Sequence, residues 1–388
     1  MTCNNGHTPR KTALALLMLA AGWGLSAPAA AQEYGRESLF RDRAYVSADA
    51  SVHSWSAGGS PIVQRSFPLS ISMPVAERAL FTIAAVPAAV EQGGGTIGGV
   101  PETQFGASYV LPGEKLWLSG SVDMPTGVTR LTREQTELAA SIAQPALGFP
   151  IGSMGHGLNT RLGCAYATSA SRLVVFGFGA AVSTKGAYEP VAPSETMHIR
   201  YAPGNEIAAN IGIDYRDGLK INRLSADYTV TYYLSDRLNG ERFFQSGVKA
   251  SLVLAASHAE PASMHRVRMR LELRAQNASV SGGMEEKTPS ARQLSLLYSY
   301  TRSAGRTLSL TGGVEFRTMS SDQFPVNGAV VSTGGGTVAI VSGELRYAAA
   351  PWCTIAPRCS FGAGSVTIMS SRHAARGFDL GIGVQCPL

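Results

Sequence analysis

The sequence predicts an all-β protein, a transmembrane antiparallel up-and-down β-barrel of about 14 to 16 strands. Three observations carry this prediction: an export signal, strands in which apolar and polar side chains alternate, and connections that alternate between short and long. The composition agrees, with 43 glycines, 13 tyrosines and only 15% charged residues. Such a composition suits a protein that turns half of its side chains toward lipid.

The first residues have the features of a secretory signal peptide. Arg10 and Lys11 precede an apolar stretch that ends at Leu25, and a run of small residues ends at Ala31. An exported barrel belongs in the outer membrane of a Gram-negative bacterium. We therefore expect a signal peptide at 1–31, a short periplasmic or lumen segment at 32–43, and an outer-membrane barrel at 44–388.

The alternation is clearest between His265 and Arg274, where Val, Met and Leu residues occupy one register and charged residues the other. Side chains of a strand point alternately to its two faces, so one face here is apolar and the other is charged. In a membrane barrel the apolar face meets lipid and the polar face meets the lumen. The candidate lumen-lining residues, including acids of other strands, are Arg266, Arg268, Arg270, Glu272, Arg274, Asp227, Glu315 and Glu344.

Two interpretations of this arginine ladder remain open. The arginines could bind the carboxylate of a passing solute, or they could pair with acids of neighbouring strands such as Asp227, Glu315 and Glu344. Pairing is the commoner arrangement, because buried charges need partners and narrow barrels fill themselves with inward ion pairs.

Similar alternation recurs along the chain in segments of about 9 to 14 residues, the length that a tilted strand needs to cross a bilayer. The clearest apolar registers run over 116–124, 207–215, 224–234, 248–254, 294–300, 308–316 and 378–384.

The connections between these segments fall into two classes that alternate. Barrels of the outer membrane have short periplasmic turns and longer external loops. Counting in this way gives about 16 strands with both termini in the periplasm, or 14 if the residues before 66 lie in the lumen. Short links occur near 76–78, 112–114, 169–171, 217–218, 303–305 and 351–358.

Two connections stand out. The segment Leu131–Leu147 contains helix formers, with Thr132 as a candidate N-cap, and predicts a short amphipathic helix in an external loop. That helix could line an access groove for an apolar ligand or merely pack on the barrel rim. The segment Ser320–Gly336 is polar and rich in glycine, and is expected to be a mobile loop.

Cysteine usage suggests one disulfide and no metal. Cys353 and Cys359 flank a short Thr-Ile-Ala-Pro-Arg segment in an exported chain, so we expect a disulfide between them. Neither the cysteine spacing nor the neighbouring histidines resemble a zinc cluster. We expect no metal site and no cofactor.

The sequence offers no motif for catalysis or for nucleic-acid binding. No Gly-x-Ser-x-Gly elbow and no His-Glu-x-x-His motif occurs. The neighbours His53 and Ser54 would face opposite sides of a strand, and so would Ser257 and His258. The basic residues are spread along strand faces without aromatic interleaving, which argues against nucleic acid as a partner.

Four short segments resemble barrels of the FadL-like superfamily, particularly the branch associated with meta-pathway phenol degradation. They are Phe67–Val75, Gln104–Tyr109, Ser121–Gly127 and Gly186–Pro190. The resemblance implies a 14-stranded outer-membrane channel that takes up hydrophobic compounds, including fatty acids and aromatics.

We therefore expect an outer-membrane channel for passive uptake of a small, hydrophobic solute of the fatty acid or aromatic class. Its partners would be outer-membrane lipids, the solute and, during biogenesis, the barrel-assembly machinery. The alternative is a structural or surface-interaction barrel without transport, in which the arginine ladder locks an ion-paired, filled lumen.

Overall fold

The computed structural model describes residues 44–387 except for 102, 114, 129, 152–156, 190–199, 218–221, 282–283, 327–328 and 369. The predicted signal peptide and the predicted segment 32–43 lie outside the described residues. The described chain is almost entirely β-strand, as the alternating pattern predicts.

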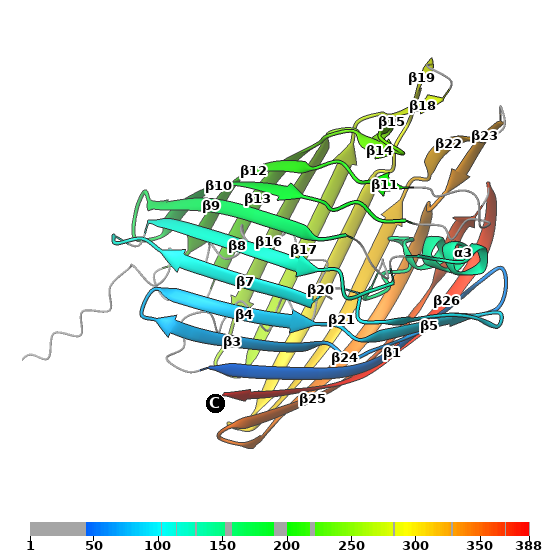
Figure 1. Ribbon diagram of the computed structural model, residues 1–388. Helices are drawn as coiled ribbons and strands as arrows, with labels where there is room; N and C mark the ends of the chain where they lie inside the picture. Colours follow the sequence, from blue (N-terminus) through cyan, green and yellow to red (C-terminus); the bar gives the residue numbers. More distant parts are fainter. Residues whose placement is uncertain are drawn as a thin grey trace, which may run out of the picture.

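Sixteen strands form one closed antiparallel barrel, which matches the larger of the two predicted counts (Figure 1). The barrel closes because β1 pairs with β3 on one side and with β26 on the other. In chain order the barrel strands within the described residues are β1 (Tyr45–Ala57), β3 (Leu69–Ala76), β4 (Ala79–Ala85), β7 (Thr103–Val110), β8 (Leu116–Met124), β9 (Asn159–Ser169), β10 (Val174–Thr184), β12 (Glu206–Arg216), β13 (Asn222–Tyr233), β16 (Lys249–Ala259), β17 (Ser263–Arg274), β20 (Gln293–Ala304), β21 (Leu308–Met319), β24 (Gly336–Ala350), β25 (Cys353–Ile368) and β26 (Ser371–Pro387).

Three further strands, β2 (Ile62–Ser66), β5 (Ala88–Gln92) and β6 (Gly95–Gly99), continue the line of β3, β4 and β7. The breaks between them contain Pro68, Pro87 and Pro101. Proline has no N–H to donate to the ladder, so it interrupts a strand without ending its direction. Because β2 pairs with β1, and β5 pairs with both β2 and β6, the wall extends further on this side.

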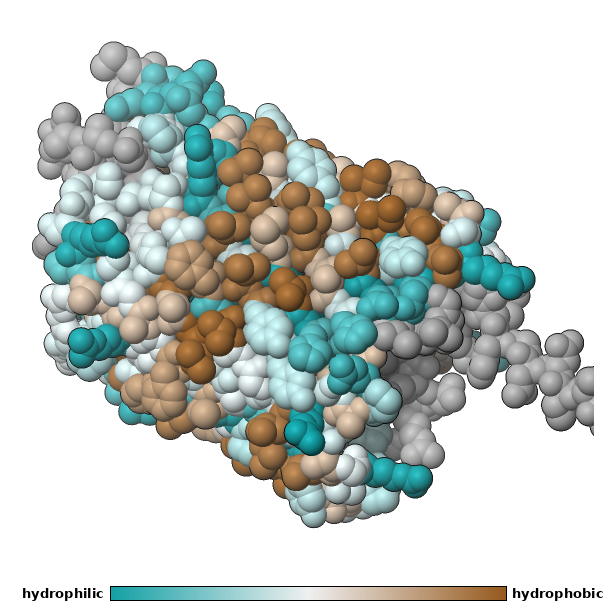
Figure 2. Space-filling model, turned by 180° about the vertical axis from the view of Figure 1, so that it is seen from behind, coloured by the Kyte–Doolittle hydropathy of each residue, from teal (hydrophilic) through white to brown (hydrophobic). Residues whose placement is uncertain are grey.

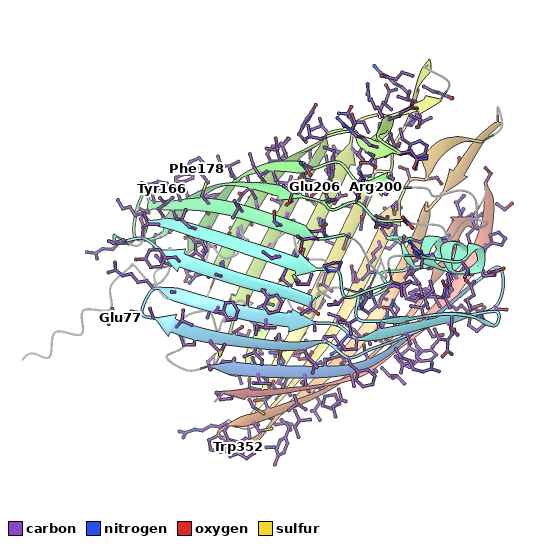
Figure 3. All side chains as sticks on the ribbon, in the orientation of Figure 1. Glu77, Tyr166, Phe178, Arg200, Glu206 and Trp352 are labelled. Carbon is purple, nitrogen blue, oxygen red and sulfur yellow. The ribbon has the colours of Figure 1, made fainter. Side chains whose placement is uncertain are left out.

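The two ends of the barrel differ. Short turns lie at one end, where Figure 3 labels Glu77 and Trp352 and Figure 1 places the C-terminus. Long connections lie at the other end, where Figure 3 labels Arg200. In outer-membrane barrels short turns face the periplasm and long loops face outside. The external strands are β11 (Tyr201–Ala202), β14 (Asp236–Leu238), β15 (Glu241–Gln245), β18 (Asn277–Ser281), β19 (Met284–Thr288), β22 (Asp322–Val326) and β23 (Ala329–Thr333).

The polar segment Ser320–Gly336 is more regular than its sequence predicts. Its described residues contain the antiparallel hairpin β22–β23, in which Asp322 lies opposite Thr333. Pairing between the two arms satisfies backbone N–H and C=O groups, so a polar and glycine-rich segment still forms strands.

The outer wall is apolar. Leu162 is 70% exposed and Phe361 is 63% exposed, and many other large apolar side chains are exposed as well. So much exposed apolar surface is favourable in lipid and unfavourable in water. Tyr166 and Phe178 point away from neighbouring strands in Figure 3. Figure 2 shows brown side chains gathered over the middle of one face, with teal ones toward its ends. An apolar band around a closed barrel is the surface of an outer-membrane protein.

The predicted disulfide between Cys353 and Cys359 is wrong. Both residues lie on one strand, β25, and no disulfide joins them in this structure. Six steps along an extended strand span about 20 Å, whereas the Cα atoms of a disulfide lie within about 7 Å of each other. The intervening Pro357 pairs in register with Ile382, so no tight turn forms there.

Candidate functional site

The long connection between β8 and β9 folds back into the barrel mouth. We call residues 128 and 130–151 of this connection the inner loop. It contains α3 (Arg133–Ile142), which confirms the helix predicted within 131–147. Thr132 caps this helix: its hydroxyl accepts from the Gln135 N–H at 3.3 Å, and its own N–H donates to the Gln135 side chain at 3.0 Å. No helix among the described residues is long and apolar enough to cross a membrane.

The inner loop carries the apolar core of the molecule, and that core lies on the inner side of the wall. Leu138 and Ile142 of α3 are 3% and 1% exposed, and Figure 1 shows the helix at the external end beside β5 and β26. The loop therefore packs against the wall and narrows the mouth. Its buried partners on β1, β2, β5, β6 and β24–β26 are Trp55, Ile62, Ala88, Val90, Ile97, Val338, Val366 and Ala375.

Gln64 of β2 anchors the loop through its backbone. Its amide nitrogen donates to the Ile151 carbonyl at 2.9 Å, and its amide oxygen accepts from the Ile151 N–H at 3.0 Å. The Gln64 side chain is fully buried. Since a buried backbone group without a partner costs about 1–3 kcal/mol, this pair of bonds holds the end of the loop against the wall.

His53 of β1 forms a second anchor. Its Nε2 accepts from the Trp55 indole at 2.9 Å, and its ring meets the Phe149 ring edge-on with centroids 5.1 Å apart. Its Nε2 also lies 3.4 Å from the Leu147 carbonyl of the loop, and its Nδ1 lies 3.6 Å from the Asp379 carboxylate. The histidine thus links the loop to the wall by ring packing.

Arg317 of β21 lies against the opposite edge of the loop. A Cβ on Gly148 would fall 2.0 Å from the Arg317 guanidinium, and Gly148 has a positive φ of +63°. The positive φ favours glycine here, and a larger residue would displace the guanidinium. Arg317 in turn donates to Glu315 at 2.7 and 2.8 Å, and Ser295 donates to the same carboxylate at 2.9 Å.

The inward register of the wall is rich in ion pairs, several between residues two positions apart on one strand. Arg270 donates to Glu272 at 2.9 Å, and Arg346 pairs with Glu344. Asp214, almost fully buried, accepts from Arg216 and Arg223 at 3.1 and 2.7 Å. Residues i and i+2 share a face of a strand, so a long arginine reaches the acid beside it.

The predicted ladder of β17 lies on the register opposite the exposed Val267 and Leu273. Arg268 is close enough to Glu315 for electrostatic attraction across the sheet. The Arg274 guanidinium lies 5.8 Å from the Tyr233 ring centroid. The remaining predicted residues are Arg266, which is half-buried opposite Ser257 and Ser299, and Asp227, which is buried beside Gly212.

A recess of about 100 Å³ opens on the lumen side across β8 to β17. We call it the lumen recess. Gly163, Ala181 and Ala208 form a floor of small side chains, and Glu206 and Arg270 belong to its charged rim. Its other polar lining residues include Ser119, Arg161, Ser183, Asn210, Thr229, Thr231, Tyr233, Lys249 and Ser251.

The recess brings together charges that the sequence prediction had not grouped. Of the predicted site residues only Arg270 lines it, while Arg161, Glu206 and Lys249 come from three other strands. Lys185 pairs with Glu206, and Lys249 lies 4.0 Å from Glu272. The polar registers of 159–169 and 206–216 carry the signal for these residues, but only the register of the closed sheet places them together.

An external cluster ties the long loops to each other. The rings of Tyr188 and Tyr201 meet edge-on with centroids 5.5 Å apart, and the Tyr201 hydroxyl donates to Asp236. Burial, then the hydrogen bond to the Asp236 carboxylate, raise the pKa of Tyr201 far above its ordinary value of 10.0. Tyr201 therefore stays protonated and keeps donating over a wide pH range.

Within the described ranges, no three His, Cys, Asp or Glu side chains gather closely enough to hold a metal ion. Charged and hydrogen-bonding side chains lie around a lumen whose mouth is narrowed by the inner loop.

Comparison with known proteins finds no matching family model and no matching curated protein. Solved structures that are similar include the TodX deltaS2S3 mutant monoaromatic hydrocarbon channel, with 12% identity, a TM-score of 0.48, and coverage of 91% of this chain and 92% of that one. The CymD monoaromatic hydrocarbon channel has 13% identity, a TM-score of 0.44, and coverage of 90% and 89%.

The outer membrane channel DcaP of Acinetobacter baumannii is similar at 6% identity and a TM-score of 0.41, with coverage of 89% of this chain and 97% of that one. At such low identity the likeness concerns the barrel alone and assigns no solute. The resemblance implied 14 strands, whereas this barrel has 16.

Proposed function

We propose that this protein is an outer-membrane channel for passive uptake of a small solute with an apolar body and a carboxylate group, such as a fatty acid or an aromatic acid. The observation that carries this proposal is the lumen recess, where the cationic Arg161, Lys249 and Arg270 surround a floor of Gly163 and alanines. Guanidinium and ammonium groups recognise carboxylates, and small side chains leave room for an apolar body.

The inner loop supports a channel whose mouth selects by size. The loop packs on β1, β2, β5, β6 and β24–β26 at the external end, so it narrows the opening through which a solute from outside would enter. The ionic wall below gives a charged group successive partners on β17, β21 and β24. Uptake along such a path needs only the concentration gradient of the solute.

The alternative is a barrel without transport, and the ion pairs of the inward register support it. Asp214 is held by two arginines, and Glu315 by an arginine and a serine. A lumen filled with such pairs would be rigid and closed. The recess supports the channel, because Arg161, Lys249 and Arg270 border an open space of about 100 Å³ rather than a packed core.

Conductance separates the two. The refolded mature protein in planar bilayers is expected to open steadily, and benzoate and hexanoate are expected to interrupt the current, whereas benzamide and hexanamide at equal concentration do not. Removing one charged hydrogen bond costs about 1.4 kcal/mol or more, so Arg161→Gln should raise the blocking concentration of benzoate about tenfold. Arg65→Gln, an exposed arginine outside the recess, serves as the matched control.

A silent barrel would overturn the channel and favour the structural alternative. Steady openings that amides block as well as acids would keep the channel and overturn the carboxylate. Contact with lipids and insertion by the barrel-assembly machinery follow from the fold class and stay predictions.

A further inference from the structure

Two cysteines that lie 33 positions apart in the sequence meet in the barrel wall. Cys353 begins β25 and Cys386 lies near the end of β26, and these strands are antiparallel neighbours. Thr354 lies opposite Gln385, so one step further along the ladder Cys353 lies opposite Cys386. The Cys353 thiol is close enough to the Cys386 thiol to interact with it electrostatically.

The other two cysteines lack this arrangement. Cys164 lies opposite Leu118 on one side and Ala180 on the other, and Cys359 lies opposite Gly343 and Leu380. Directly opposed residues of an antiparallel pair have Cα atoms about 4.5–5.5 Å apart, within the range that a disulfide spans. The pair on β25 and β26 therefore has the geometry for a bond without movement of the backbone.

The pair also lies where oxidation is available. Cys353 follows the turn that contains Trp352, at the end of the barrel with short turns (Figure 3). This end faces the periplasm, an oxidising compartment. Both cysteines are partly exposed, so a soluble oxidant can reach them.

We propose that Cys353 and Cys386 form a disulfide in the exported protein, which bonds the last strand of the barrel to its neighbour. One thiolate attacks the disulfide of a periplasmic thiol–disulfide oxidant and forms a mixed disulfide. The second thiolate then displaces the oxidant, so the S–S bond forms while the oxidant gains two electrons and leaves as a dithiol. The two cysteine thiols lose their protons to solvent or to the leaving oxidant thiolates.

The position of this bond gives it a role in closing the barrel. β26 is also the strand that pairs with β1, and Val46 of β1 lies opposite Cys386 on the other side. A covalent link at the periplasmic end of β26 resists separation of this strand from the wall. Closure of the barrel then depends less on the hydrogen bonds of the β1–β26 seam alone.

Peptide mapping tests the bond directly. The protein is taken from outer membranes in the presence of an alkylating agent and digested with trypsin without reduction. Cleavage after arginine places Cys353 in 347–358, Cys359 in 359–372, Cys386 in 377–388 and Cys164 in 162–172, so each thiol has a peptide of its own. We expect 347–358 linked to 377–388, and both peptides released by reduction.

The variants Cys353→Ser and Cys359→Ser are compared by the gel shift between folded and heated protein. Cys353→Ser should lose the linked peptide, still fold, and unfold at a temperature several degrees lower under non-reducing conditions. Cys359→Ser should keep both the link and the temperature. The proposal is overturned if the alkylated protein carries free Cys353 and Cys386, or if either is linked to Cys164 or Cys359.

Discussion

At the scale of single residues, the polar side chains of this barrel act mainly as anchors. Gln64 illustrates the point, since one amide satisfies both the N–H and the C=O of Ile151 inside an apolar cluster. Only a side chain that both donates and accepts can do this without charge. Gln64 therefore fixes the end of the inner loop through two hydrogen bonds at a fully buried side chain.

Replacement of Gln64 should loosen the loop. Gln64→Leu keeps the volume but leaves both Ile151 backbone groups without their partner, at a cost of about 1–3 kcal/mol. The released loop would spend a larger fraction of time away from the wall, so single-channel records should show new substates of higher conductance. Gln92→Leu is the control, because its side chain makes only a 3.5 Å contact to Ser60 at the exposed edge. Unchanged records for Gln64→Leu would contradict the anchoring role.

Tyr201 provides a prediction on pH. Its pKa is raised in the folded protein, first by burial and then by the hydrogen bond to Asp236, so the unfolded tyrosine ionises first as pH rises above 10.0. Its contribution to stability is thus complete below that pH and declines as pH rises beyond it. In an absorbance titration of tyrosinate, a fraction of the tyrosine should ionise only at a pH above the ordinary pKa of 10.0. Tyr201→Phe should remove this late-ionising fraction, and Asp236→Asn should move its ionisation toward lower pH. An unchanged late fraction in Tyr201→Phe would count against this account.

At the scale of elements, the strands follow from the sequence because lipid makes their alternation strict. The helix could also be predicted, since Thr132 and Gln135 supply its cap locally. The place of that helix could not, because its buried surface is complementary to Val90 and Ile97 of strands that precede it and to Val338 and Val366 far beyond it. The pairing of Glu315 with Arg317 could be predicted from the sequence, because residues two positions apart in a strand share a face.

The β1–β26 seam depends on an arginine that reaches over a strand. Arg358 of β25 forms a two-point ion pair with Asp49 of β1, with one bond of 2.7 Å, and passes over Gly381 and Gly383 of β26. A Cβ on Gly381 would lie 2.9 Å from the guanidinium carbon, and one on Gly383 would lie 3.2 Å from the Asp49 carboxylate. The absence of side chains at these two positions lets the pair form.

Arg358→Met should therefore weaken closure of the barrel. Both partners have 18% exposed side chains, and removal of one leaves a mostly buried carboxylate, at a cost of about 2–4 kcal/mol. We expect a lower urea concentration at the midpoint of unfolding. The gel shift between folded and unfolded barrel measures this midpoint. Arg65→Met is the matched control, because its pair with Glu91 is about half exposed and contributes less than about 1 kcal/mol. Equal midpoints for the two variants would refute a special role of the seam.

At the scale of the whole molecule, the fold is inverted relative to a water-soluble protein. Large apolar side chains cover the outside, charged side chains line the inside, and the apolar core is confined to the inner loop at one end. Strand number could be predicted to within two, because the residues before 66 pattern poorly. Those residues contain β1 of the barrel and the short β2, which continues the line of β3 beyond Pro68.

The inside-out arrangement predicts opposite chemistry for neighbouring residues of β17. In a variant whose four exported cysteines are replaced by serine, Arg268→Cys and Val267→Cys are compared in intact outer membranes. Val267 is 41% exposed on the lipid side, whereas Arg268 lies on the register of the lumen charges. A membrane-impermeant maleimide should label position 268 through water in the lumen and leave position 267 unmodified in lipid. Detergent should make position 267 reactive, which shows that its thiol was protected and not absent. Labelling of 267 alone in membranes would mean that the barrel has the reverse register, and with it that neither the arginine ladder nor the lumen recess faces the path of a solute.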